Sequence, residues 1–147
     1  MASSIKVTTT INASPQKVWE NFINPENLKY WLTGFVSAQP LTGAVGEAGS
    51  TSKLIFMERG KEMEITETVL ISIPHQQYVF RMEHTSFAAE NDIRLISFGN
   101  RTELIQTTHL NPKGLLMKLL LPFIKGAMKK RTLNELLKLK NLIESKS

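Results

Sequence analysis

Cysteine is absent from the 147-residue chain, and aromatic residues make up only 7% of it. The lack of cysteine excludes disulfide scaffolds, thiolate metal sites and cysteine nucleophiles. No apolar run reaches the length of about 20 residues that crosses a bilayer, because Lys118 and Pro122 interrupt the most apolar stretch, 115–124. The first residues lead directly into a strand pattern, without the features of a signal peptide. We therefore expect a soluble cytoplasmic protein with a single domain, residues 1–147.

Sequence motifs for several kinds of chemistry are also missing. The three histidines, at positions 75, 84 and 109, lack the spacing of metal ligands. A Gly-x-Ser-x-Gly nucleophile motif is absent. Glycines 43, 46 and 49 have the wrong spacing for a dinucleotide-binding loop. We therefore expect neither a metal nor a cofactor.

The charge of the chain is concentrated at one end. The net charge is +5, but residues 112–147 contain nine basic and two acidic residues, so this segment carries +7 and the remainder −2. A basic helix of this kind can form a solvated outer face or attract anionic lipid. Nucleic-acid binding is not expected, because neither aromatic residues interleaved with the basic ones nor a base-reading motif is present.

The N-terminal part of the chain has the pattern of one strand and two short helices. Apolar residues alternate with polar ones over 5–11, the period of a half-buried strand. Ser14-Pro15 and Asn24-Pro25 then each combine a preferred N-cap residue with proline at the first helical position. The first helix carries Trp19 inward and the second carries Trp31.

The remainder has the pattern of strands joined by short turns, followed by one long helix. Glycine-rich residues 41–49 indicate a loop, and 85–91 a second one. The alternation predicts strands at 35–39, 51–58, 61–73, 78–84, 93–98 and 102–110. Asn111-Pro112 predicts the start of a helix that ends near residue 144, with a kink or break near 119–121 because Pro122 lies inside it.

This order of elements predicts an α+β fold. Strands joined by short turns pair antiparallel, and such a sheet buries one face. The long C-terminal helix is its only large partner, and a strongly twisted sheet curls around a helix. A single kinked helix rarely fills the concave side of such a sheet completely, which leaves room for a ligand. We therefore expect a curved sheet of about seven strands wrapped around the C-terminal helix.

Three motifs carry a resemblance to a known superfamily: ASPQKVW at 13–19, NPENLKYW at 24–31 and the glycine-rich passage at 43–49. Together with the order of elements, they resemble the START/pollen-allergen (SRPBCC) superfamily, and within it the polyketide cyclase/dehydrase-like proteins. The resemblance covers essentially the whole chain. It implies the helix-grip fold and a deep hydrophobic cavity, but it does not settle the reaction, because the superfamily includes carriers as well as cyclases.

The apolar residues expected near this cavity come from the second short helix, the strands and the C-terminal helix. Ligand pockets are mostly apolar and aromatic, and flexible methionines suit a wall that adapts to varied shapes. Filling of an ordinary core is the alternative role for each of these residues. The predicted lining consists of Trp31, Phe35, Phe56, Met63, Ile65, Phe80, Met82, Met117, Leu120, Phe123, Ile124 and Met128.

Three titratable residues are candidate catalytic groups. Glu67 is in phase with Met63 and Ile65, His84 is in phase with Phe80 and Met82, and His109 lies on the last strand in phase with Ile105; Gln106, in phase with Leu104, is a further polar residue there. A buried carboxylate or imidazole has a shifted pKa and can act as an acid or base. A solvated strand end or a satisfied internal hydrogen bond is the alternative for each, and a His84–Glu67 pair is a hypothesis.

The sequence favours a binding protein over an enzyme. The leading prediction is a module, monomeric or weakly dimeric, that binds and can transport a hydrophobic small molecule or lipid. The first alternative is a cyclase or dehydratase in which Glu67, His84 or His109 transfers a proton. The second is a lipid carrier that docks transiently on anionic membranes, or on a partner protein, through its basic helix.

Overall fold

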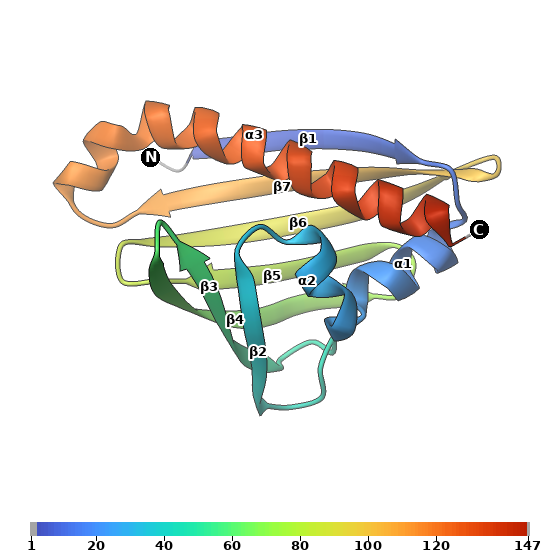
Figure 1. Ribbon diagram of the computed structural model, residues 1–147, viewed down its shortest axis with the longest axis horizontal. Coiled ribbons are helices and arrows are strands. Elements are labelled where there is room, and N and C mark those ends of the chain that lie inside the picture. Colours follow the sequence, from blue (N-terminus) through green and yellow to red (C-terminus); the bar gives the residue numbers. More distant parts are fainter. Residues whose placement is uncertain (1–2, 147) are drawn as a thin grey trace.

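Seven antiparallel strands form one sheet in the computed structural model, which describes residues 3–146. The order across the sheet is β1-β7-β6-β5-β4-β3-β2, so every strand after the first pairs with its neighbour in the chain and β1 closes the far edge against β7 (Figure 1). The strands are β1 (Ser3–Ile11), β2 (Phe35–Thr42), β3 (Thr51–Glu58), β4 (Lys61–Ile73), β5 (Gln77–Glu83), β6 (Phe87–Phe98) and β7 (Arg101–Pro112).

Two short helical segments follow β1, as the sequence predicts. The first is α1 (Pro15–Ile23), and the second consists of the 3₁₀ turn η1 (Pro25–Asn27) and α2 (Leu28–Trp31). The long helix α3 (Leu115–Ser145) follows β7. The Ser14 hydroxyl accepts a hydrogen bond from the Lys17 N–H at 3.2 Å, and the Asn24 side chain accepts one from the Glu26 N–H at 3.0 Å. Both predicted helix starts are therefore confirmed.

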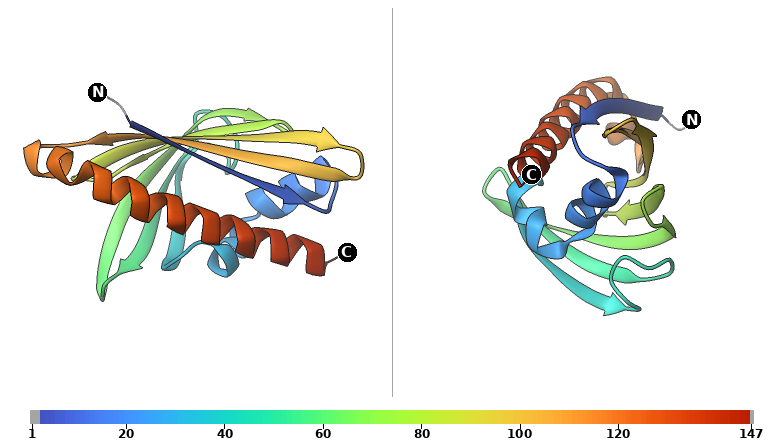
Figure 2. Two further views of the ribbon diagram at one scale, coloured as in Figure 1. Left: turned by 90° about the horizontal axis from the view of Figure 1, so that it is seen from above. Right: turned by 90° about the vertical axis from the view of Figure 1, so that its right-hand side faces the viewer.

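The core lies between the concave face of the sheet and the C-terminal half of α3. Figure 2 shows the strands curling around this side, with α3 lying along β1, α1 near the C-terminal end of α3 and α2 beside its middle. Leu136, Leu139 and Ile143 of α3 are fully buried, as are Ile11 of β1 and Leu104 of β7. The sheet therefore grips the helix, and the predicted α+β helix-grip fold is confirmed.

A β-bulge in β4 reverses the direction of the side chains in its second half. Val69 is paired with Phe80, but Ile71 is paired with Val79, so two steps along β4 match one step along β5. Because side chains alternate along a strand, the extra residue turns Ile71 to the outer face. Strict alternation along the strand from Met63 would instead place Ile71 on the inner face.

Two boundaries near the C-terminal helix also differ from the prediction. The segment expected to be a loop at 85–91 contains the start of β6, and Asn111-Pro112 is the end of β7, paired with Ala88 and Phe87, instead of a helix start. The helix begins at Leu115, after Gly114. Gly114 has φ of 86°, which favours glycine, so this residue makes the turn between strand and helix.

The helix α3 is continuous through Pro122. Proline removes one backbone hydrogen bond but does not always end a helix. The predicted break is therefore not present, and Figure 1 shows a bend in the first turns of α3, which lie beyond the end of β7.

Candidate functional site

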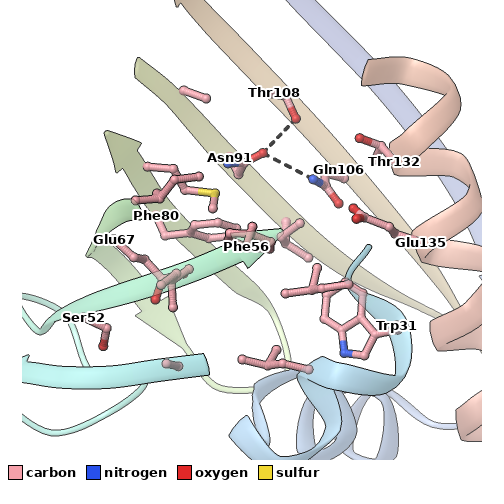
Figure 3. A pocket seen from close by; sticks show the side chains of 18 of the residues that line it. Trp31, Ser52, Phe56, Glu67, Phe80, Asn91, Gln106, Thr108, Thr132 and Glu135 are labelled. Atoms are coloured by element: carbon pink, nitrogen blue, oxygen red, sulfur yellow. Dashed lines mark hydrogen bonds between the residues drawn. The ribbon is translucent and has the colours of Figure 1, made fainter. Parts of the chain in front are cut away.

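A partly open cavity of about 650 Å³ lies between the concave face of the sheet and α3. Its wall comes from β2 to β7, from the helices α1 and α2, and from the middle of α3, so it draws on almost every element of the fold (Figure 3). Most of the lining is apolar. The sheet and α3 thus enclose the space that the order of elements predicts.

Seven of the twelve predicted lining residues are on the cavity wall. Their role in ligand binding stays a prediction. Phe35 is adjacent to the wall, because its ring packs edge-on against that of Phe56 with 5.9 Å between the ring centroids. The seven are Trp31, Phe56, Met63, Ile65, Phe80, Met82 and Met128.

The other four predicted lining residues are in the N-terminal half of α3 and do not line the cavity. Phe123 is 77% exposed and Leu120 is 41% exposed. The buried stripe of α3 runs from Leu139 through Thr132 and Met128 to Leu121. Successive members are seven, four and seven residues apart, which keeps them on one face of the helix. Leu120 and Phe123 lie on exposed faces of the helix, whereas Met117 and Ile124 are half-buried on the side of Leu121 and Met128. None of the four is on the cavity wall, so the expectation that they reach the cavity is wrong.

A hydrogen-bonded row of polar side chains crosses the apolar wall on β6 and β7 (Figure 3). The Asn91 carbonyl oxygen Oδ1 accepts hydrogen bonds from Thr108 Oγ1 at 2.8 Å and from Gln106 Nε2 at 3.3 Å. These bonds satisfy the carbonyl oxygen of Asn91 and leave its amide nitrogen without a partner among the described residues. The row can therefore donate from Asn91 and accept at the amide oxygen of Gln106.

A second polar group joins α3 to the opposite side of the cavity. The Arg131 guanidinium donates to the Thr33 carbonyl oxygen at 2.7 Å and forms ion pairs with Glu58 at the end of β3 and with Glu135 one turn along α3. The Glu135 carboxylate also accepts a hydrogen bond from the Thr33 N–H at 2.8 Å. This network fixes the middle of α3 to β3 and to the turn after α2.

Glu67 of β4 is a titratable group on the cavity wall. Burial removes water from its carboxylate and raises its pKa from 4.5 to about 7. Its carboxylate forms neither a hydrogen bond nor an ion pair within residues 3–146. Tyr78 also lines the cavity, and its pKa is raised by burial first and by the negative charge of Glu67 second. Because the pKa of Glu67 is about 7, its carboxyl group can either hold or release a proton near neutral pH.

The two candidate histidines lie outside the cavity. His84 follows the end of β5, where its ring packs against Phe87 and its Nδ1 accepts a hydrogen bond from the Ser86 N–H at 3.1 Å. His109 is paired with Ser4 and Glu90 in the sheet, and its side chain is on the outer face because Thr108 and Leu110 point inward. The hypothesis of a His84–Glu67 pair is therefore wrong. Within residues 3–146, no three acidic or histidine side chains are grouped closely enough to hold a metal ion.

Sequence reasoning misses most of the polar groups of the site. Asn91 is in a segment predicted as a loop, and Arg131 and Glu135 enter the prediction only as charges of the C-terminal segment. Alternation in β7 does place Thr108 in phase with Gln106 and Leu104, so a search for polar residues on the inner face would have found Thr108. The indole N–H of Trp31 is another such group, because it is buried and has no acceptor among the described residues.

A family model identifies the family of the chain. The model described as "Polyketide cyclase / dehydrase and lipid transport" matches residues 2–144. The chain belongs to this family. The match and the fold also confirm the resemblance to the START/pollen-allergen (SRPBCC) superfamily. Membership points to the binding of hydrophobic ligands or to a cyclase-type role, and does not distinguish between them.

Solved structures with the same fold are similar over almost their whole length. The Zhui aromatase/cyclase from Streptomyces sp. R1128 has a TM-score of 0.83 at 14% identity, with 98% of this chain and 94% of that chain covered. TTHA0849 from Thermus thermophilus has a TM-score of 0.81 at 18% identity, and Ara h 8.0201 has 0.79 at 12%; each pair is covered to 99% on both sides. At these identities the similarity shows the fold alone.

The curated protein sequences contain no match to the chain. Among the described residues, no helix has the length and apolar character needed to span a membrane.

Proposed function

We propose that this protein binds one apolar small molecule, or the apolar part of a lipid, in the cavity between the sheet and α3. The observation that carries the proposal is the cavity itself, because about 650 Å³ of largely apolar space is within the range of ligand pockets. Family membership supports the same class of ligand.

The polar row on β6 and β7 narrows the chemistry of the ligand. An otherwise apolar wall with a few placed polar groups orients a ligand through its own polar atoms. The free amide nitrogen of Asn91 is a donor on the cavity wall, so it matches a carbonyl, ether or hydroxyl oxygen of the ligand. We therefore infer an apolar ligand that carries at least one such oxygen.

Filling the cavity tests this proposal. Ala89 lines the cavity, whereas Ala88, the preceding residue of β6, faces the other side of the sheet. Ala89→Phe should weaken the binding of an environment-sensitive apolar dye by about tenfold or more, since a partly filled cavity leaves less apolar area to contact. Ala88→Phe is the matched control and should change the affinity less than about twofold.

Dye fluorescence titration, with circular dichroism to confirm folding, gives both affinities. Absence of dye uptake by the wild type, or equal loss in the two variants, would contradict capture in the cavity.

A second candidate function is proton transfer to or from a bound ligand by Glu67. Its support is the carboxyl group on the cavity wall with a pKa of about 7, because an acid or base works best when its pKa is near the operating pH. NMR titration of the Glu67 carboxyl carbon tests the requirement. A midpoint near 7 keeps the candidate, and one near 4.5 excludes it.

Glu67→Gln then separates the two functions. Gln has nearly the same shape and cannot transfer a proton, so a pure binding protein should retain its ligand affinity and alter no bound compound in either form. Chemical conversion of an extracted ligand by the wild type but not by this variant would favour the enzyme.

A further inference from the structure

The N-terminal half of α3 exposes a continuous apolar surface that no part of the described chain covers. Its five large side chains are between 41% and 77% exposed. They are on one side of the helix, because their spacing of one, three and four residues repeats that of a helix face. We call this surface the outer apolar face: Leu115, Leu116, Leu119, Leu120 and Phe123.

Five lysines lie next to the outer apolar face in the sequence, and acidic residues are absent between 113 and 134. Lys113 donates a hydrogen bond to the His84 carbonyl oxygen at 3.0 Å. The other four form no ion pair within residues 3–146, so their charges are not neutralised by the protein. These four are Lys118, Lys125, Lys129 and Lys130.

This combination fits a bilayer better than another folded surface. An interfacial helix buries its apolar side among the acyl chains while its lysines contact the phosphate groups. Each lysine near an anionic membrane surface adds about 1 kcal/mol of attraction. The occupant must therefore be both apolar and negatively charged over the length of about three helical turns.

We propose that the outer apolar face docks this protein on the surface of anionic membranes. Docking places α3 parallel to the bilayer plane, with Phe123 and the leucines in the headgroup and acyl boundary. Met128 of the cavity wall follows Phe123 by five residues on the same helix, so the cavity lies close to the docked face. The proposal goes beyond ligand binding, because the cavity can be filled with or without a membrane.

Co-sedimentation with vesicles tests the docking. The wild type should bind vesicles of phosphatidylcholine and phosphatidylserine, bind phosphatidylcholine vesicles much more weakly, and lose the difference as salt rises. Leu119→Ser combined with Phe123→Ser should reduce partitioning by more than about tenfold, since about two large side chains lose their apolar contact.

A matched variant tests whether the loss of binding is specific to the outer apolar face or follows from removing any two exposed apolar side chains. Ile96 and Phe98 are exposed on β6 beside the β6–β7 hairpin, at the other end of the molecule in Figure 1. Ile96→Ser with Phe98→Ser should leave partitioning within about twofold of the wild type.

Two sets of four Lys→Gln substitutions test the contribution of charge to membrane binding. Replacing the four unpaired lysines by Gln should lower binding by more than about tenfold. A control with the same net charge change, at positions elsewhere on the protein, should lower it much less. The control replaces Lys6, Lys17, Lys61 and Lys138 by Gln.

Three results would overturn the docking proposal. The first is no preference of the wild type for anionic vesicles. The second is equal loss of binding in the surface variants and their controls. The third is a wild-type dimer, seen by analytical ultracentrifugation, that Leu119→Ser with Phe123→Ser dissociates while vesicle binding is unchanged, because the outer apolar face would then bind a second copy. Dye binding in the cavity should be the same in all these variants, so failure of docking and failure of ligand capture are distinguishable.

Discussion

The two halves of α3 meet the rest of the molecule in opposite ways. In the C-terminal half, Leu136, Leu139 and Ile143 are fully buried against the sheet. In the N-terminal half, Leu119 and Phe123 are more than half exposed. Both halves are rich in leucine, so apolar content does not distinguish them.

The difference arises from the side of the helix that carries the apolar residues. The C-terminal half has Leu136, Leu139 and Ile143 in phase on the buried stripe and only Leu133 and Leu137 exposed. The N-terminal half has most of its leucines on other faces, beside unpaired lysines. The buried half of α3 therefore holds the fold together and covers the cavity. The exposed half is free to contact something else.

Leucine truncation on each half gives the largest expected contrast. Leu139→Ala should lower the free energy of unfolding by about 2–5 kcal/mol, because it leaves a cavity in a packed core. Leu119→Ala should change it by less than about 0.5 kcal/mol. Chemical denaturation measures both, and similar losses in the two variants would remove the distinction between the halves.

Glu67 reports whether the buried half of α3 encloses a poorly hydrated interior. Its pKa rises from 4.5 to about 7 on folding, so the folded state holds the proton more tightly and the wild type loses stability as pH rises through this range. Glu67→Gln should therefore be more stable than the wild type by about 3 kcal/mol above pH 7, with the difference disappearing near pH 4.5. Urea denaturation across pH measures it, and a constant difference would contradict the burial of this carboxyl.

Arg131 lies near the junction between the two halves. Arg131→Gln removes the ion pairs with Glu58 and Glu135 and the hydrogen bond to Thr33, and should lower the free energy of unfolding by about 1 kcal/mol, since these partly exposed ion pairs contribute little each. Lys130→Gln, on the neighbouring residue without an ion pair, is the control and should be neutral. Equal effects on thermal unfolding would show that the network does not anchor the helix.

Pro122 gives the smallest expected effect on stability. Pro122→Ala restores a backbone hydrogen bond in the exposed half, so amide hydrogen exchange at 115–121 should slow while the global free energy of unfolding changes by less than about 1 kcal/mol. A gain of about 3 kcal/mol, the usual penalty for proline inside a helix, would mean that this half folds together with the core.

Local signals in the sequence are sufficient to predict most of the fold. The caps Ser14 and Asn24 fix helix starts through hydrogen bonds to nearby residues, and β3 and β4 alternate clearly between turn residues. Asn111-Pro112 is misleading because the same pair can end a strand, and here the partner strand β6 continues to Phe87 opposite Pro112. Pairing with β6 extends β7 through Asn111-Pro112, and a local sequence pattern carries no information about such pairing.

The site is less predictable because it depends on register across strands. Glu67, Met63 and Ile65 share one strand and alternate as expected up to the bulge before Ile71. The bonds from Thr108 and Gln106 to Asn91 join β7 to β6, and single-strand periodicity cannot place such a pair side by side. The prediction for Phe123 was wrong for another reason. The position of the sheet decides which side of α3 is buried, and Phe123 is not on that side.

Native mass spectrometry of the protein purified without organic solvent is the most direct test of ligand capture beneath α3. The account predicts that the wild type carries a non-covalently bound apolar molecule, released on activation in the gas phase, and that Ala89→Phe carries much less of it than Ala88→Phe. A wild type with only the mass of its polypeptide, which also gains no mass when incubated with a cell lipid extract, would contradict the account.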